Sequence, residues 1–177
     1  MPALYESHCI GCPYFNAEHL PEHYREIRST PLSMEDNSAS VLLIFQAPGV
    51  EEWSKGKPVA SMKPSSAGMR LTAAFRVKQQ TRLDYNITNT VQCFPGKKSE
   101  TVILRSRDKA PTATARQHCL EWLRKDIESH SYKRIVAFGT HARKAIRDLG
   151  LEMDPRIHFT RHPTGGISNE KLAAALG

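Results

Sequence analysis

The sequence predicts an α/β fold, a single domain in which helices flank a central, mainly parallel sheet of four strands. Short apolar runs typical of buried strands, of which residues 41–45 are the clearest, alternate along the chain with segments of helical periodicity. This alternation is typical of a parallel sheet covered on both faces. The length of 177 residues suits one domain spanning 1–177. Residues 1–40 are expected to form an N-terminal extension that wraps on the sheet.

Composition narrows the class of protein. The chain has 25 Lys and Arg against 18 Asp and Glu, a formal charge of +7, which favours polyanionic partners and nucleic acid first. No apolar run reaches the roughly eighteen residues of a membrane span, and the N-terminal stretch lacks the charged and apolar regions of a signal peptide. We therefore expect a soluble, cytoplasmic protein that acts as a monomer and does not bind membranes.

The four cysteines, Cys9, Cys12, Cys93 and Cys119, are poor candidates for disulfides in a reducing compartment. Metal binding, redox chemistry and core packing remain. Cys9 and Cys12 enclose Gly11 in a compact Cys-x-x-Cys knuckle whose sulfurs can point at one metal. A thioredoxin-type motif would follow a strand, and no strand pattern precedes Cys9. From spacing alone, zinc and an iron-sulfur cluster are equally served by four thiolates.

The first half of the chain centres on the apolar run 41–45, preceded by a helix expected at residues 17–28. Gln46 follows the run, and Ala47-Pro48-Gly49 breaks it, so this turn is expected at the carboxyl edge of the sheet. Ligands bind at that edge in open α/β sheets, although an ordinary exit loop would have the same pattern.

Residues 50–66 are expected to form a long loop in which Glu51 and Glu52 are either catalytic carboxylates or a solvated acidic pair. A helix capped by Ser65 or Ser66 is predicted at 67–78, and a second strand at 84–91.

The second half begins with a basic loop at 94–112, which is either a phosphate-contacting arm or solvated surface. Thr112 or Thr114 is expected to cap the next helix, on which Cys119 lies. A third strand is predicted at 133–139 and a helix capped by Thr140 up to residue 149. A fourth strand at 156–160 and a closing helix at 171–176 complete the pattern.

Three of the predicted strand exits open on one rim, and they carry Gln46, Asn89 and His162. Asn89 offers one acceptor and two donors, which match the hydrogen-bonding edge of a pyrimidine. His162 can donate to an oxygen on which negative charge develops as a bond breaks. No Gly-rich phosphate loop occurs in the sequence. The rim therefore suits a neutral heterocycle.

Taken in order, these motifs resemble the uracil-DNA glycosylase superfamily, specifically its iron-sulfur branch, family 4. The matching segments are Gln46-Ala47-Pro48-Gly49 followed by Glu51-Glu52, then Gly56-Lys57-Pro58, Ile87-Thr88-Asn89, Cys93 and His162-Pro163. The resemblance covers most of the chain and uses every cysteine.

The resemblance implies a role for each matching residue. Gln46 would be the catalytic turn residue, with the backbone of Ala47, Pro48 and Gly49 near the base. Asn89 would read the base, and His162 would stabilise the departing base anion as the second catalytic residue. Cys9, Cys12, Cys93 and Cys119 would hold a [4Fe-4S] cluster, with Zn²⁺ as the alternative.

The chain departs from the family pattern at the pocket. Phe45 and Gln46 replace the usual Gly-Glu, and Val59 stands where the family has an aromatic ring that stacks on uracil. Stacking is worth ~1–3 kcal/mol per base. Ala47 occupies the position of a water-activating aspartate in some members, so no general base is assigned.

The expected activity is that of a DNA glycosylase that flips out and excises uracil or a bulkier modified pyrimidine, such as a hypermodified cytosine of viral DNA. Either DNA repair or antiviral defence would use it. The alternatives are a non-catalytic, metal-stapled nucleic-acid-binding protein and an iron-sulfur electron carrier.

Overall fold

As predicted, the sheet contains four parallel strands, and their order is β2-β1-β3-β4. The structure is a computed structural model and describes residues 9–99 and 107–177. The strands are β1 (Val41–Phe45), β2 (Asn86–Asn89), β3 (Arg134–Phe138) and β4 (Ile157–Thr160). Phe45 pairs with Asn89 in the register, so the ends of β1 and β2 lie side by side.

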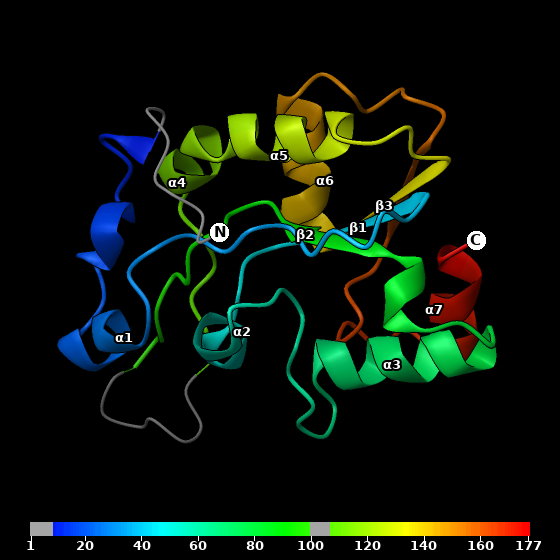
Figure 1. Ribbon diagram of the computed structural model, residues 1–177, viewed down its shortest axis with the longest axis horizontal. Coiled ribbons are helices and arrows are strands. Elements are labelled where there is room, and N and C mark those ends of the chain that lie inside the picture. The colour runs from blue at the N-terminus through cyan, green and yellow to red at the C-terminus, as the bar shows by residue number, and fades with distance from the viewer. Residues whose placement is uncertain (1–8, 100–106) are drawn as a thin grey trace.

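Helices cover both faces of the sheet (Figure 1). On one face, Leu43 and Phe45 pack in a cluster with side chains of α3 (Ala67–Val77) and α7 (Asn169–Ala175). On the other face, Leu42 and Ile44 pack against α5 (Leu120–Glu128) and α6 (Gly139–Asp148). The uninterrupted apolar run of β1 follows from this burial on both sides.

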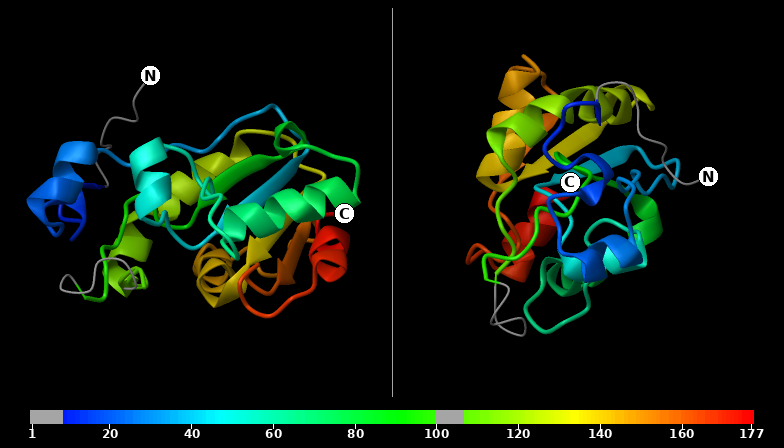
Figure 2. Two further views of the ribbon diagram at one scale, coloured as in Figure 1. Left: turned by 90° about the horizontal axis from the view of Figure 1, so that it is seen from below. Right: turned by 90° about the vertical axis from the view of Figure 1, so that its left-hand side faces the viewer.

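A third cluster of buried side chains lies beyond the strands, at the end of the molecule that holds α1 (Glu22–Ile27) and α4 (Ala113–His118) (Figures 1 and 2). Trp53 of α2 (Val50–Lys55) is completely buried there, and its Nε1 donates a hydrogen bond to the Tyr24 carbonyl oxygen at 3.1 Å. Cys93 and Cys119 belong to the same cluster. The N-terminal extension is thus packed into the domain.

Several helices differ from the bounds that the sequence predicted. The loop predicted at 50–66 begins with α2, whose buried Trp53 gives it an apolar side. The helix predicted at 17–28 is limited to α1 by Pro21, and a 3-10 turn, Phe15–Ala17, precedes it. Thr140 does not cap α6, which begins one residue earlier at Gly139.

The other predicted caps are present. The hydroxyl of Ser66 accepts a hydrogen bond from the amide of Met69 at the start of α3, and that of Thr112 accepts one from Ala115 at the start of α4. The helix after Thr112 is interrupted at Cys119, which separates α4 from α5. None of the helices in the described ranges is both long and apolar enough to span a bilayer.

Candidate active site

A cavity of about 470 Å³ opens at the carboxyl ends of β1 and β4, within the range of small-molecule sites. It brings together residues of five segments: the end of β1 with its turn, α2, the segment leading into α3, the basic loop after β2, and the loop after β4. Of the residues proposed to face the base, six line it: Gln46, Ala47, Pro48, Gly49, Val59 and His162. Two of the three predicted strand exits, those that carry Gln46 and His162, therefore meet at this cavity.

The turn after β1 is fastened to the segment after β2. The carbonyl oxygen of Gln46 accepts hydrogen bonds from the Val91 amide at 3.1 Å and from the Thr90 hydroxyl at 2.6 Å. The Phe45 carbonyl accepts another from the Thr90 amide at 2.8 Å. These bonds hold the backbone of the turn in a fixed position at the cavity.

Asn89 does not line the cavity, but it pairs in register with Phe45, which does. Its side chain is 1 % exposed, and neither Oδ1 nor Nδ2 finds a hydrogen-bond partner among residues 9–99 and 107–177. Side chains alternate along a strand, so Asn89 points to the same face as Ile87, which packs with Phe45 and Val59. Buried amides are nearly always paired, so the unpaired amide of Asn89 makes it a candidate for binding a ligand or a water.

His162 reaches the cavity from the loop after β4, and its ring meets Phe45 edge-on at 6.1 Å. The Thr164 hydroxyl lies 2.9 Å from Nδ1, and the Thr164 amide donates to Nδ1 at 3.4 Å. An accepting Nδ1 leaves the proton of the neutral ring on Nε2. Burial lowers the pKa of His162, which favours this neutral form.

Val59 has a φ of 48°, in the left-handed region that β-branched residues avoid. Such a conformation costs about 1–3 kcal/mol and persists only where surrounding contacts impose it. The side chain is 7 % exposed and forms part of the cavity wall. The wall at Val59 is aliphatic and held under strain.

Both acidic residues of α2 line the cavity, and both are engaged. The Glu52 carboxylate accepts a hydrogen bond from the Ser61 amide at 2.9 Å. Glu51 pairs with Lys63 at 2.7 Å, and the hydrogen bond from Lys63 is the main reason that the pKa of Glu51 lies below its usual value. These contacts connect α2 to the segment before α3. Glu51 and Glu52 are therefore not the solvated acidic pair that the sequence left open.

Sequence reasoning missed the acidic residue that the basic loop, 94–112, brings to the cavity. Asp108 lines it, pairs with Lys97 at 2.6 Å, and would lie 2.7 Å from a Cβ at Gly49. The basic loop therefore closes onto the turn through a neutralised pair at its base. Arg105, expected to contact phosphates, lies outside the described residues. The signal available in the sequence was the opposite charge of Lys97 and Asp108 near the two ends of the basic loop.

The four cysteines line a second, smaller cavity. Cys9, Cys93 and Cys119 are buried, and burial raises the pKa of Cys93 well above its usual value and that of Cys119 to about 12. The indole N–H of Trp122 donates to the Cys9 sulfur at 3.4 Å. Among the described residues, no three Cys, His, Asp or Glu side chains stand close enough to hold a single metal ion. In the described residues, the four thiols therefore line one cavity but do not form a site for a single metal ion.

Comparison with known proteins agrees with this geometry. The uracil DNA glycosylase superfamily matches residues 33–174 of the chain. The chain is also similar to a type-4 uracil-DNA glycosylase of Pyrobaculum aerophilum, with 28 % identity over 134 residues. That match covers 76 % of this chain and 61 % of the relative, so the chain spans less than two thirds of the relative's length. By its sequence match and its four-stranded parallel fold, the chain belongs to the uracil-DNA glycosylase superfamily.

Proposed function

We propose that the protein is a DNA glycosylase that hydrolyses the N-glycosidic bond of a nucleotide flipped out of the helix. One observation carries the proposal: the turn after β1 and His162 line a single cavity, and Asn89, whose amide is unpaired within residues 9–99 and 107–177, lies beside Phe45 of its wall in the strand register. The superfamily match and the relative named as a uracil-DNA glycosylase support it. The net charge of +7 suits a DNA partner.

In this mechanism, the base enters the cavity with its hydrogen-bonding edge toward β2. The Asn89 amide, which has one acceptor and two donors, pairs with that edge after a small opening of the wall. Flipping costs a few kcal/mol, and the new hydrogen bonds offset part of this cost. Asn89 thereby gains the partners that its amide lacks within the described ranges 9–99 and 107–177.

His162 acts on the leaving group. As the bond between C1′ and the base nitrogen breaks, its electron pair passes to the base, and negative charge develops on the base oxygens. The Nε2–H of His162 can donate to such an oxygen. A water oxygen then bonds to C1′, and its proton is released to solvent or to the base. One donor of this kind is typically worth about 10²–10³ in rate.

Two features favour a substrate larger than uracil. Val59 leaves more space than an aromatic ring would, and the cavity of about 470 Å³ is open at its mouth. We therefore propose that uracil is accepted and that a bulkier modified pyrimidine, such as a hypermodified cytosine, is accommodated as well. DNA repair and antiviral defence are both roles for such an enzyme.

We further propose that Cys9, Cys12, Cys93 and Cys119 hold a [4Fe-4S] cluster. A single zinc ion with bonds of ~2.3 Å would draw four sulfurs together closely. A [4Fe-4S] cluster also takes four thiolates, and all four cysteines line one cavity, which supports a shared cofactor. When bound, such a cluster would brace the N-terminal extension and the α4–α5 junction against the end of β2.

The decisive test uses oligonucleotides that carry uracil, hypoxanthine or a bulky modified cytosine. After incubation with the protein, alkali cleaves the strand at each abasic site. We expect cleavage with at least one base and a loss of about 10²–10³-fold in the single-turnover rate for His162→Ala. His158→Ala is the matched control, because His158 lies within β4 and contacts Arg134 instead.

Full activity of the His162→Ala variant would remove His162 from the mechanism. Binding of DNA without release of any base would instead identify a non-catalytic nucleic-acid-binding protein. A colourless, zinc-containing protein would overturn the iron-sulfur assignment alone.

A further inference from the structure

The segment 58–61, which forms one wall of the cavity, contains no regular secondary structure. Its central residue, Val59, is held in the left-handed region at a φ of 48°. A β-branched side chain does not adopt this conformation without outside support. The position of the wall must therefore be imposed by contacts from other parts of the chain.

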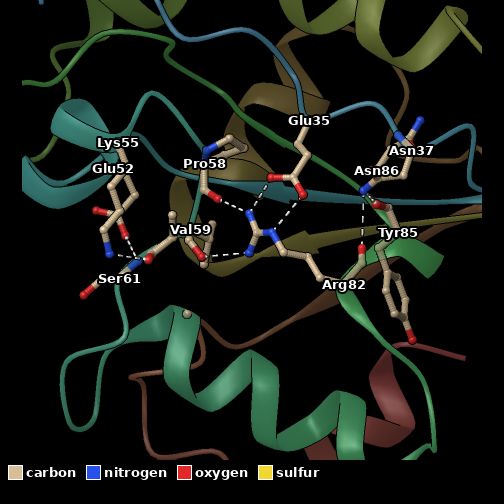
Figure 3. A network of polar contacts seen from close by, with 12 residues as sticks. Glu35, Asn37, Glu52, Lys55, Pro58, Val59, Ser61, Arg82, Tyr85 and Asn86 are labelled. Atoms are coloured by element: carbon tan, nitrogen blue, oxygen red, sulfur yellow. Dashed lines mark hydrogen bonds and ion pairs between the residues drawn. The ribbon is translucent and has the colours of Figure 1, made fainter.

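The strongest of these contacts come from Arg82, at the start of the 3-10 turn Arg82–Asp84 before β2 (Figure 3). Its Nη1 donates to the Val59 carbonyl oxygen at 3.0 Å, and its Nη2 donates to the Pro58 carbonyl oxygen. One guanidinium thus binds two successive carbonyls of the wall. A lysine, with a single ammonium, lacks the planar fork that this geometry uses.

Arg82 is itself held by Glu35 through two parallel hydrogen bonds of 2.9 Å each (Figure 3). The Glu35 side chain is only 13 % exposed. Burial raises the pKa of Glu35, but the hydrogen bonds and charge of Arg82 outweigh it, and the pKa lies below its usual value. The pair is therefore ionised and bidentate, the arrangement that fixes orientation best.

Glu35 connects this pair to the strand that carries Asn89. Its amide donates to the Ile87 carbonyl at 2.9 Å, and its carbonyl accepts from the Ile87 amide at 3.0 Å. Ile87 lies two residues before Asn89 in β2. A continuous set of polar contacts therefore runs from the strand of Asn89 through Glu35 and Arg82 to Val59.

The far side of the segment is fixed independently. The Ser61 amide donates to Glu52 at 2.9 Å, and the Ser66 hydroxyl donates to the Ser61 carbonyl at 2.8 Å. These bonds anchor the end of the segment to α2 and to the start of α3. Lys55 holds the Ala60 carbonyl at 3.1 Å, and Arg82 holds the carbonyls of Pro58 and Val59.

We propose that Arg82 and Glu35 are positioning residues that set the distance between Val59 and the base-reading strand, and thereby the size of the base that the cavity accepts. This inference rests on the proposed function, because size selectivity is defined by base release. Neither residue lines the cavity, so neither touches the base. Their effect passes through the backbone of Pro58 and Val59.

The test compares Arg82→Lys, Arg82→Gln and Glu35→Gln with wild type on oligonucleotides carrying uracil or a bulky 5-substituted cytosine. The steady-state kcat and KM are measured for each base, and the melting temperature is measured for each variant. We expect the ratio of kcat/KM values between the two bases to change at least threefold in Arg82→Gln, mainly through KM. Arg82→Lys should lie between wild type and Arg82→Gln.

Arg147→Gln is the matched control, because Arg147 also forms a double hydrogen bond with a glutamate, Glu152, but on an exposed surface. We expect its selectivity ratio to equal that of wild type. A second background, Val59→Gly, accepts a positive φ without support. There, Arg82→Gln should shift the ratio by less than half as much, which is a coupling that a purely structural role would not produce.

An unchanged ratio in all three variants, with a lowered melting temperature, would show that the pair only stabilises the fold and would overturn the inference while leaving the proposed function intact. If wild type releases no base from any oligonucleotide, the proposed function fails, and the selectivity role fails with it. Should Arg82→Gln not fold, Arg82→Lys and Glu35→Gln decide the outcome by the same ratio.

Discussion

Two asparagines in β2 differ in whether their side-chain amides form hydrogen bonds. Asn86 and Asn89 are both buried. The Asn86 amide is fully paired: Oδ1 accepts from the Asn37 and Ala39 amides, and Nδ2 donates to Asp36 and Tyr132. The Asn89 amide has no partner in the described part of the chain. The first asparagine therefore serves the fold, and the second is free to serve a ligand.

This contrast predicts opposite effects on stability. Asn86→Leu removes four hydrogen bonds and should lower the free energy of unfolding by about 2–4 kcal/mol. Asn89→Leu removes an unpaired buried amide and should leave that free energy unchanged or raise it by ~1 kcal/mol, while base release is lost. Equilibrium urea unfolding checks both. Equal destabilisation by the two substitutions would mean that the Asn89 amide has a structural partner.

His162 leads to a prediction about pH. Burial holds its pKa below the usual value of 6.5, so the ring is neutral at pH 7 with Nδ1 accepting from Thr164. As the pH falls through this lowered pKa, Nδ1 gains a proton and the contact with the Thr164 amide becomes repulsive. We therefore expect single-turnover base release to be constant above about pH 6.5 and to fall below the lowered pKa.

The control for this profile is His162→Gln, which can still donate a hydrogen bond but does not titrate. Its residual rate should show no inflection in the same range. A wild-type rate that rises on acidification through pH 6.5 would show that the imidazolium, and not the neutral ring, is the acting form.

At the scale of elements, the sequence predicted best where local patterns decide the structure. The apolar run 41–45 became β1 without change, since a strand buried on both faces needs uninterrupted apolar residues. Helix α2 was missed because its six residues carry only one buried side chain, Trp53, and show no periodicity to detect. Thr140 was expected to cap α6, but Gly139, at a φ of 82°, takes the first helical position.

The packing of α3 against the cavity wall predicts the effect of a substitution at Gly68. Glycine to alanine in a helix normally stabilises by up to about 1 kcal/mol. Here a Cβ would lie 2.3 Å from the Ser61 carbonyl oxygen and 2.8 Å from that of Val59, so the clash outweighs the helix preference. We expect Gly68→Ala to destabilise the protein by about 1–3 kcal/mol and to weaken base release.

The control for this substitution is Ala73→Gly on the same helix. It should cost about 1 kcal/mol of stability through helix preference alone and leave base release unchanged. Thermal unfolding and the alkali-cleavage assay measure both quantities. A stabilised Gly68→Ala variant would show that the wall can move without cost.

At the scale of the whole molecule, the sequence predicted which strand ends meet. It did not predict the contacts that charged side chains make between segments far apart in the chain. The strand exits with Gln46 and His162 converge because parallel strands end at one edge of a sheet. The contacts of Asp108 with Gly49 and of Arg82 with Val59 join residues far apart in the chain, and no local pattern encodes them. Asn89 pairs in register with Phe45, but only Phe45 of the two lines the cavity, and no local pattern distinguishes them.

The cysteine-lined cavity carries the last prediction, because it links three separate segments into one unit. Cys9 and Cys12 belong to the N-terminal extension, Cys93 follows β2, and Cys119 separates α4 from α5. If all four hold one cluster, the loss of any single ligand should remove it. Each of the four Cys→Ser variants should therefore lose the brown colour and most of about four irons per chain.

The same variants should unfold at lower temperature, since binding to the folded state alone stabilises it and the extension would lose its cross-link to the domain. The four substitutions serve as controls for one another, because a shared cofactor requires similar losses from exposed and buried positions alike. Cys12 is the most exposed of the four, so its replacement by serine costs least in packing. Full iron content in Cys12→Ser, with losses only at the three buried positions, would separate core packing from ligation and contradict a four-cysteine site.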